Sequence, residues 1–141
     1  MKIAITGHTN GIGRAFAEAL QARGHEIVGI SRSGGENIRR IAHTVKLIEP
    51  CDLFINNAQS YFAQTELLYD LWKKWQGQTK WIWNISTQMT ESPVDTQTEH
   101  DELDMSLYRI QKISLEEASR QLQHKNSLPK ITIVRPGRVK D

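Results

Sequence analysis

The stretch KIAITGHTNGIGR, residues 2–14, decides the fold of this 141-residue chain. Residues 2–6 are β-formers, glycines follow at positions 7, 11 and 13, and residues 14–23 have helical composition and spacing. We therefore predict a strand, a tight turn and a helix. Such a turn leaves unpaired backbone N–H groups at the positive end of the helix dipole, which suits a phosphate group. The alternative is a purely structural turn.

Each of the three glycines has a predicted role in this turn. Gly7 permits the turn itself, Gly11 lets a pyrophosphate approach the backbone, and Gly13 lets the helix pack closely against the strand. The spacing is G-x-x-x-G-x-G, which differs from the more common G-x-G-x-x-G fingerprint.

Strand-like and helix-like segments alternate along the rest of the chain. We expect further strands at 25–30, 52–55, 80–85 and 130–134, and helices at 36–49, 64–75 and 105–125. This alternation predicts a single α/β domain over residues 1–141: a three-layer, Rossmann-like, doubly wound parallel sheet that binds ligands at the carboxyl ends of its strands. In the fourth strand, Trp81 and Trp83 should share one face and Ile82 the other. The last helix should carry Leu107, Ile110, Ser114, Ala118 and Leu122 along one face.

Composition narrows the classes of partner. The net charge is +2, from 18 Lys and Arg against 16 Asp and Glu without a basic stripe, so no nucleic acid partner is expected. The apolar runs are too short to span a bilayer and strand composition begins at Lys2, which predicts a cytoplasmic protein without a signal peptide or a membrane partner. The single cysteine, Cys51, is expected to fill a small buried space, and no metal site is predicted. Residues 88–104 are expected to form an acidic loop, either simply solvated or a lid that attracts cations.

Motifs with chemical meaning fall at the predicted carboxyl ends. Together with the glycine turn, they resemble the short-chain dehydrogenase/reductase family. Asn56-Asn57-Ala58 resembles its N-N-A-G motif, with Gln59 in place of glycine, and Asn84-Ile85-Ser86-Thr87 resembles its N-[IV]-S-S motif. The remaining two are Tyr108-x-x-x-Lys112, which matches the Y-x-x-x-K pair, and Pro136-Gly137, which matches the turn that meets the nicotinamide.

The resemblance implies a carbonyl/alcohol oxidoreductase with a small-molecule substrate. Tyr108 would exchange a proton with the substrate oxygen, Lys112 would stabilise the phenolate, and Thr87 would polarise the same oxygen, with Ser86 as the alternative hydroxyl. The expected cofactor-binding residues are Gly7, Thr9, Asn10, Gly11, Ile12, Gly13, Ser31, Arg32, Ser33, Asn56, Asn57, Ala58, Tyr108, Lys112, Pro136, Gly137 and Val139.

The end of the second strand predicts NADP(H) as the cofactor. An NAD site places a carboxylate there on the ribose, whereas this chain has Ser31-Arg32-Ser33 and no acidic residue until Glu36. A guanidinium binds a 2′-phosphate through two charge-assisted hydrogen bonds. The alternative is a solvated arginine.

The chain also departs from the family's pattern. The segment from Arg32 to Cys51 is too short for the family's third strand, so the family's order 3-2-1-4-5-6 becomes 2-1-3-4-5. The helical asparagine of the family's catalytic tetrad is absent, and Thr87 lies further than usual from Tyr108.

These departures keep other functions open. The main alternative is a non-catalytic NADP(H)-binding module, and Val134-Arg135-Pro136-Gly137 suggests sugar-nucleotide epimerase chemistry as a third possibility. By analogy with relatives, we expect a homodimer formed through helices 64–75 and 105–125.

Overall fold

The computed structural model of the protein describes residues 1–88 and 99–137. Within these residues no helix combines the length and the apolar character needed to cross a membrane. The elements, in chain order, are β1 (Lys2–Thr6), α1 (Gly11–Ala22), β2 (Glu26–Ile30), α2 (Ile41–Ile48), β3 (Leu53–Asn56), α3 (Ala63–Lys74), β4 (Trp81–Ile85), α4 (Glu99–Lys125) and β5 (Lys130–Val134).

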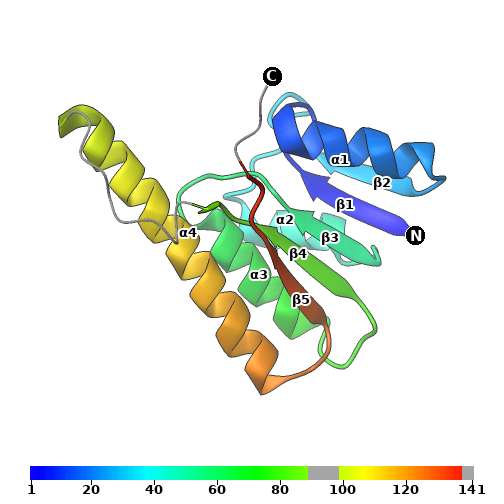
Figure 1. The fold of residues 1–141 in the computed structure, drawn as a ribbon. Coiled ribbons are helices and arrows are strands. Elements are labelled where there is room, and N and C mark those ends of the chain that lie inside the picture. The colour runs from blue at the N-terminus through cyan, green and yellow to red at the C-terminus, as the bar shows by residue number, and fades with distance from the viewer. Residues whose placement is uncertain (89–98, 138–141) are drawn as a thin grey trace.

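The five strands form one parallel sheet in the order β2-β1-β3-β4-β5 (Figure 1). This confirms the predicted fold class and strand order. Each strand is short and mostly apolar, as expected when both faces of a parallel sheet are covered. The order places the carboxyl ends of β1, β3 and β4 side by side, where the predicted motifs lie.

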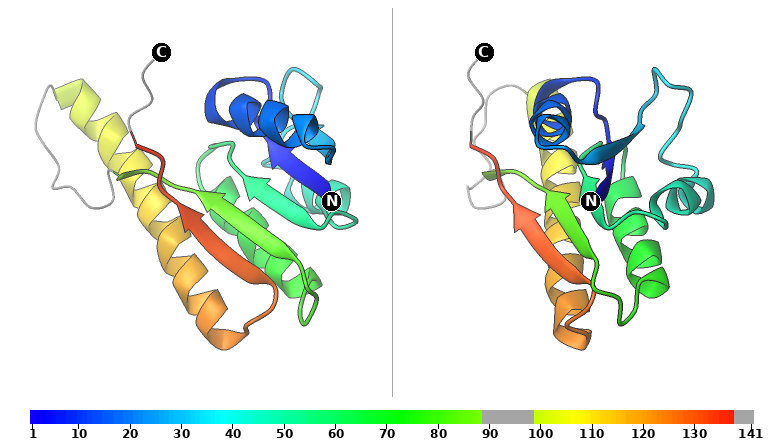
Figure 2. Two further views of the ribbon diagram at one scale, coloured as in Figure 1. Left: turned by 45° about the vertical axis from the view of Figure 1, so that its right-hand side comes forward. Right: turned by 90° about the vertical axis from the view of Figure 1, so that its right-hand side faces the viewer.

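Helices cover the two faces of the sheet unequally. Helix α1 packs on one face, and α2, α3 and α4 pack on the other (Figures 1 and 2). Along β4, Trp81 and Trp83 join the core on the α1 side and Ile82 joins the core beneath the three helices, so the predicted alternation is confirmed. The ring of Phe16 from α1 meets Trp83 edge to face at 5.9 Å between centroids.

Two predicted element boundaries are wrong. Helix α2 begins at Ile41 rather than at residue 36, because the preceding segment forms turns in which Ser31 O accepts hydrogen bonds from the backbone N–H groups of Gly34 and Glu36. Residues 99–104, predicted as part of an acidic loop, form the first turns of α4. The rest of that predicted loop, residues 89–98, lies outside the described residues.

The apolar face predicted for α4 is only partly buried. Leu122 is buried and Ala118 packs against the core, whereas Leu107 and Ile110 are each 50% exposed. Within residues 106–125, where the side chains of this helix are described, the buried residues are Lys112, Leu115, Glu116, Ser119 and Leu122. Three of these are polar, and they are buried because they bond to the sheet end and to neighbouring helices, which an apolar pattern cannot indicate.

The close approach of α1 to β1 requires glycine at position 13. A Cβ atom added at Gly13 would lie 2.1 Å from the carbonyl oxygen of Gly7, and backbone cannot move aside cheaply. We therefore expect Gly13→Ala to lower the free energy of unfolding by about 3 kcal/mol, measured by urea denaturation. The control is Gly34→Ala, whose Cβ would lie 3.4 Å from Ser31 Oγ, an ordinary contact. Equal losses in the two variants would contradict the close-packing role.

Candidate functional site

The glycine turn presents the start of α1 at the carboxyl end of β1. Gly7 and Gly11 have φ angles of +72° and +53°, which residues other than glycine rarely adopt. Asn10 precedes α1 in an extended conformation, its side chain makes no capping hydrogen bond, and the first turn contains no acidic residue. The first N–H groups of α1 therefore remain able to bind an anionic group.

Asn57 and Ala58 hold this turn in place. Their backbone N–H groups donate to Thr6 Oγ1 at 3.0 and 3.1 Å, and Asn57 Nδ2 donates to Thr6 O at 3.1 Å. The side chain of Asn57 therefore contacts the turn itself. A Cβ on Gly7 would lie 3.2 Å from the Ala58 Cβ, so the two loops pack tightly.

A cavity of about 390 Å³ opens beside the turn. Seven of the predicted cofactor-binding residues line it: Gly7, Thr9, Asn10, Ser31, Arg32, Ser33 and Ala58. Six further lining residues were not predicted: Ile30, Glu36, Asn37, Ile38, Gln59 and Ser60. The turns that follow β2 bring three of these residues, Glu36, Asn37 and Ile38, back toward the glycine turn.

The cavity contains side chains of both charges. Arg32 is exposed at its wall, and Glu36 lines the same wall with its carboxylate 2.9 Å from His43 Nε2 of α2. Sequence reasoning treated Glu36 as too distant from the strand end to matter. The signal that it returns is the Gly34-Gly35 pair, since Gly35 has a φ of +85° and reverses the chain.

A second cluster lies at the carboxyl end of β4, around Lys112. Its ammonium donates to Gln64 Oε1 at 2.7 Å and to Ile85 O at 2.9 Å, and it lies 5.5 Å from the ring centroid of Tyr108. The structure thus brings Tyr108 and Lys112 together, as the motif predicts. It also adds Gln64 from α3, which sequence reasoning missed.

Burial shifts both ionisable groups of this pair. It raises the pKa of the Tyr108 phenol above its ordinary value. It lowers the pKa of Lys112 to about 8, against the opposing effect of the Glu116 carboxylate. In this arrangement the Lys112 ammonium bonds to Gln64 and Ile85 and faces the Tyr108 ring. The stabilisation of a phenolate by Lys112 stays a prediction.

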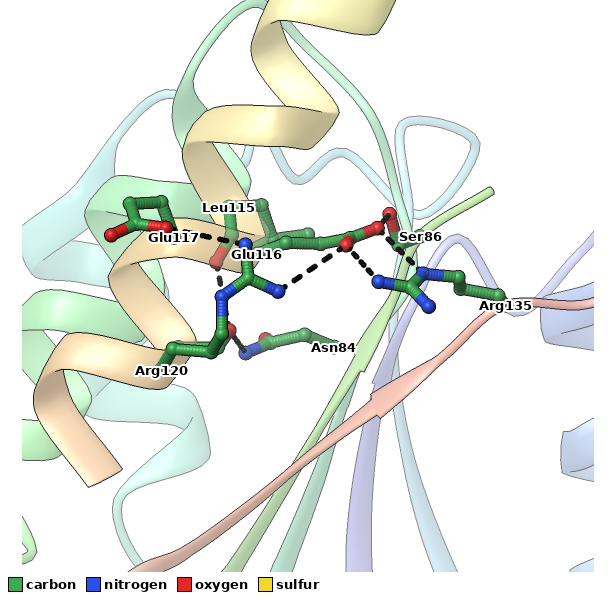
Figure 3. A network of polar contacts seen from close by, with 8 residues as sticks. Asn84, Ser86, Leu115, Glu116, Glu117, Arg120 and Arg135 are labelled. Carbon is green, nitrogen blue, oxygen red and sulfur yellow. Dashed lines mark hydrogen bonds and ion pairs between the residues drawn. The ribbon is translucent and has the colours of Figure 1, made fainter. Parts of the chain in front are cut away.

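Ser86, at the end of β4, is engaged by a buried carboxylate. Its Oγ donates to Glu116 Oε2 at 2.5 Å, and Arg135 binds the same carboxylate through Nε at 3.1 Å and through a second, shorter contact (Figure 3). Arg120 approaches from the next turn of α4 at 3.7 Å. This network joins β4, α4 and the end of β5.

The remaining predicted residues occupy three places. Pro136 and Gly137 follow β5 beside the segment after β4, since a Cβ on Gly137 would lie 3.7 Å from Gln88 Nε2. Thr87 lies in that segment and is partly exposed, whereas Asn56 is fully buried and bonds to Asn84 at 2.9 Å. Gly11, Ile12 and Gly13 form the first turn of α1, and Val139 lies outside the described residues.

A hydrogen bond connects the wall of the cavity to the helix that carries Lys112. Gln59, from the wall of the cavity, donates to the side-chain carbonyl of Gln111, the residue before Lys112. The same amide also donates to Tyr61 O at 3.2 Å. The loop after β3 is therefore tied to α4.

Comparison with known proteins supports the resemblance. The model of the NAD dependent epimerase/dehydratase family matches residues 3–67, which contain the glycine turn. No curated protein matches the chain. Many solved structures do.

Three solved structures illustrate the likeness. The 3-alpha-hydroxysteroid dehydrogenase from Pseudomonas sp., complexed with NADH, has 20% identity and a TM-score of 0.73 over 99% of this chain and 73% of its own. A short chain dehydrogenase from Burkholderia cenocepacia in complex with NADP has 16% identity and a TM-score of 0.78 over 99% and 72%. A bulky-bulky ketone specific alcohol dehydrogenase from Comamonas testosteroni has 19% identity and a TM-score of 0.72 over 96% and 72%. The predicted resemblance is therefore confirmed in the fold, which is that of the short-chain dehydrogenases.

The Glu116 network predicts a large stability effect from one atom. Glu116→Gln keeps the shape of the side chain but removes the negative charge to which Ser86 and Arg135 bond. The positive charge of Arg135 then loses its partner, and an uncompensated charge of this kind is strongly destabilising. We expect the free energy of unfolding in urea to fall by about 3 kcal/mol. The matched control is Glu117→Gln, an exposed neighbour, which should leave stability unchanged. Similar behaviour of the two variants would mean that the buried network contributes nothing.

Proposed function

We propose that this chain, whose fold is that of the short-chain dehydrogenases, is an oxidoreductase that uses a nicotinamide cofactor to interconvert a carbonyl and an alcohol. The observation that carries the proposal is the pairing of Tyr108 with a buried Lys112 at the same sheet edge as the glycine-turn cavity. Relatives of this fold are complexed with NADH or NADP, which supports a nicotinamide cofactor of either kind.

The residues around the cavity fit a dinucleotide. The uncapped start of α1 suits its pyrophosphate, and the backbone is open at Gly11, where an added Cβ would meet no atom within 4 Å. We further propose NADP(H), with Arg32 binding the 2′-phosphate. Glu36 opposes this preference, since a carboxylate repels a phosphate and accepts a hydrogen bond from a ribose hydroxyl.

Tyr108 is the proposed proton donor. Reduction of a carbonyl requires a hydride at carbon and a proton at oxygen, and a bound reduced nicotinamide supplies the hydride. Tyr108 gives its phenolic proton to the oxygen and takes it back from the alcohol in the reverse direction. Thr87 is the proposed hydroxyl that polarises this oxygen, because Ser86 already donates to Glu116.

Two other aspects remain proposals. A non-catalytic cofactor-binding module would share the cavity but not depend on Tyr108. A homodimer through α3 and α4 is supported by the exposure of Tyr69, Leu107 and Ile110 on these helices.

Cofactor choice tests the assignment of the cavity. We expect NADPH to bind more tightly than NADH, and Arg32→Ala to weaken NADPH binding about tenfold without changing NADH binding, since a charge-assisted bond to phosphate is lost. Glu36→Gln should strengthen NADPH binding. Fluorescence titration at fixed ionic strength measures these dissociation constants. Equal affinities that Arg32→Ala leaves unchanged would overturn the NADP(H) proposal.

The chemistry is tested at Tyr108. Tyr108→Phe keeps the ring and removes the proton, so kcat with a panel of carbonyl substrates should fall by at least about 10²-fold while NADPH affinity stays nearly the same. Tyr69→Phe, on the exposed face of α3, is the matched control and should retain full activity. If the parent protein binds NADPH but reduces no carbonyl, the non-catalytic module becomes the better description.

A further inference from the structure

The side chain of Lys112 is a buried cation. It is only 3% exposed, and a buried ammonium is tolerated only when hydrogen-bond acceptors surround it. An ammonium has three N–H donors. Among the described residues, two acceptors are present, the side-chain carbonyl of Gln64 at 2.7 Å and the backbone carbonyl of Ile85 at 2.9 Å. The third donor makes no hydrogen bond to a described residue, and the ammonium lies 5.5 Å from the centroid of the Tyr108 ring.

Gln64 is itself fixed in one orientation. It lies in the first turn of α3 and is 3% exposed. Its Nε2 donates to Asn56 O at 2.7 Å and to Ile85 O at 3.1 Å, the last carbonyl groups of β3 and β4. Because the nitrogen faces two carbonyls, the amide oxygen must face the ammonium. Turning the amide over would set oxygen against oxygen on one side and nitrogen against ammonium on the other.

We propose that Gln64 is a positioning residue that holds the Lys112 ammonium at the carboxyl ends of β3 and β4, with its remaining donor available to the bound cofactor. The inference rests on the proposed function for the identity of that ligand. The positioning of the ammonium does not depend on that ligand. It follows from the hydrogen bond between Lys112 of α4 and Gln64 of α3, whose side chains are both buried.

The neutrality of Gln64 has a chemical consequence. From α3 and from the end of β4, Lys112 meets two uncharged acceptors, Gln64 Oε1 and Ile85 O. From its own helix it meets the Tyr108 ring and the Glu116 carboxylate, which Arg135, Arg120 and Ser86 also engage. A neutral acceptor leaves burial as the dominant influence, so the lysine has a lowered pKa of about 8. A carboxylate at position 64 would hold the proton much more strongly.

A purely structural role for Gln64 would lead to a different result. If Gln64 only joined the ends of two strands, its replacement would cost stability and leave the proton affinity of Lys112 unchanged. The two roles are separated by the pKa of Lys112, which can be measured in the full chain without cofactor. Nuclear magnetic resonance of 13C-labelled lysine reports this value, and the signal is assigned by its loss in Lys112→Met.

The test uses two variants with opposite expected shifts. Gln64→Glu replaces the amide with a carboxylate and should raise the proton affinity of Lys112 at least tenfold, which is one pH unit. Gln64→Asn withdraws the carbonyl and should lower the proton affinity. Ser119→Ala is the control, since Ser119 is equally buried and bonds to Asn84 at 2.8 Å without contacting Lys112. General damage to the fold would move both Gln64 variants in the same direction, and circular dichroism checks that each is folded.

Titration with NADPH from pH 6.5 to 10 supplies the second readout. Binding by the parent should weaken as Lys112 loses its proton near pH 8, and in Gln64→Glu this weakening should move to higher pH by the same amount as the lysine signal. An unchanged lysine signal in both Gln64 variants would overturn the positioning role, whatever the cofactor does. Failure of the parent to bind NADPH or NADH would instead overturn the proposed function, and with it the ligand-directed part of this inference.

Discussion

The burial of one ammonium group constrains the carboxyl ends of β3 and β4. Lys112 needs acceptors, and Gln64 and Ile85 O supply them. Gln64 then needs acceptors for its amide nitrogen, and Asn56 O is one of them. The side chain of Asn56 continues the series to Asn84 at 2.9 Å. Because these buried polar groups bond to one another, α3, α4 and the ends of β3 and β4 are joined as one connected set.

The glycine turn is held by an independent set of bonds. Thr6 and Asn57 lock the loop after β3 against the turn after β1, and no charged group takes part. The two sets meet at Gln59, which reaches α4 through Gln111. The loop after β3 therefore lines the cavity and also contacts α4 next to Lys112. A ligand that reaches both places would require this arrangement.

Much of the fold could be predicted from the sequence because its strands are continuous apolar runs and its turns are marked by glycine. The site could be predicted only in part. Local patterns locate Tyr108 and Lys112, but the partners of Lys112 come from a distant helix, and nothing in the sequence around Gln64 indicates that it is buried. For the same reason, the apolar pattern of α4 does not indicate that Leu107 is exposed, because burial on this helix follows hydrogen bonding at the sheet end.

The length of α4 has a mechanical consequence. Its 27 residues make a rod about 40 Å long, far longer than β4, and its first turns extend beyond the sheet (Figures 1 and 2). Lys112 is buried at the end of β4, and Tyr108 lies one turn nearer the projecting end of the helix. The proposed proton donor therefore lies where the part of the helix that packs on the sheet meets the part that extends beyond it.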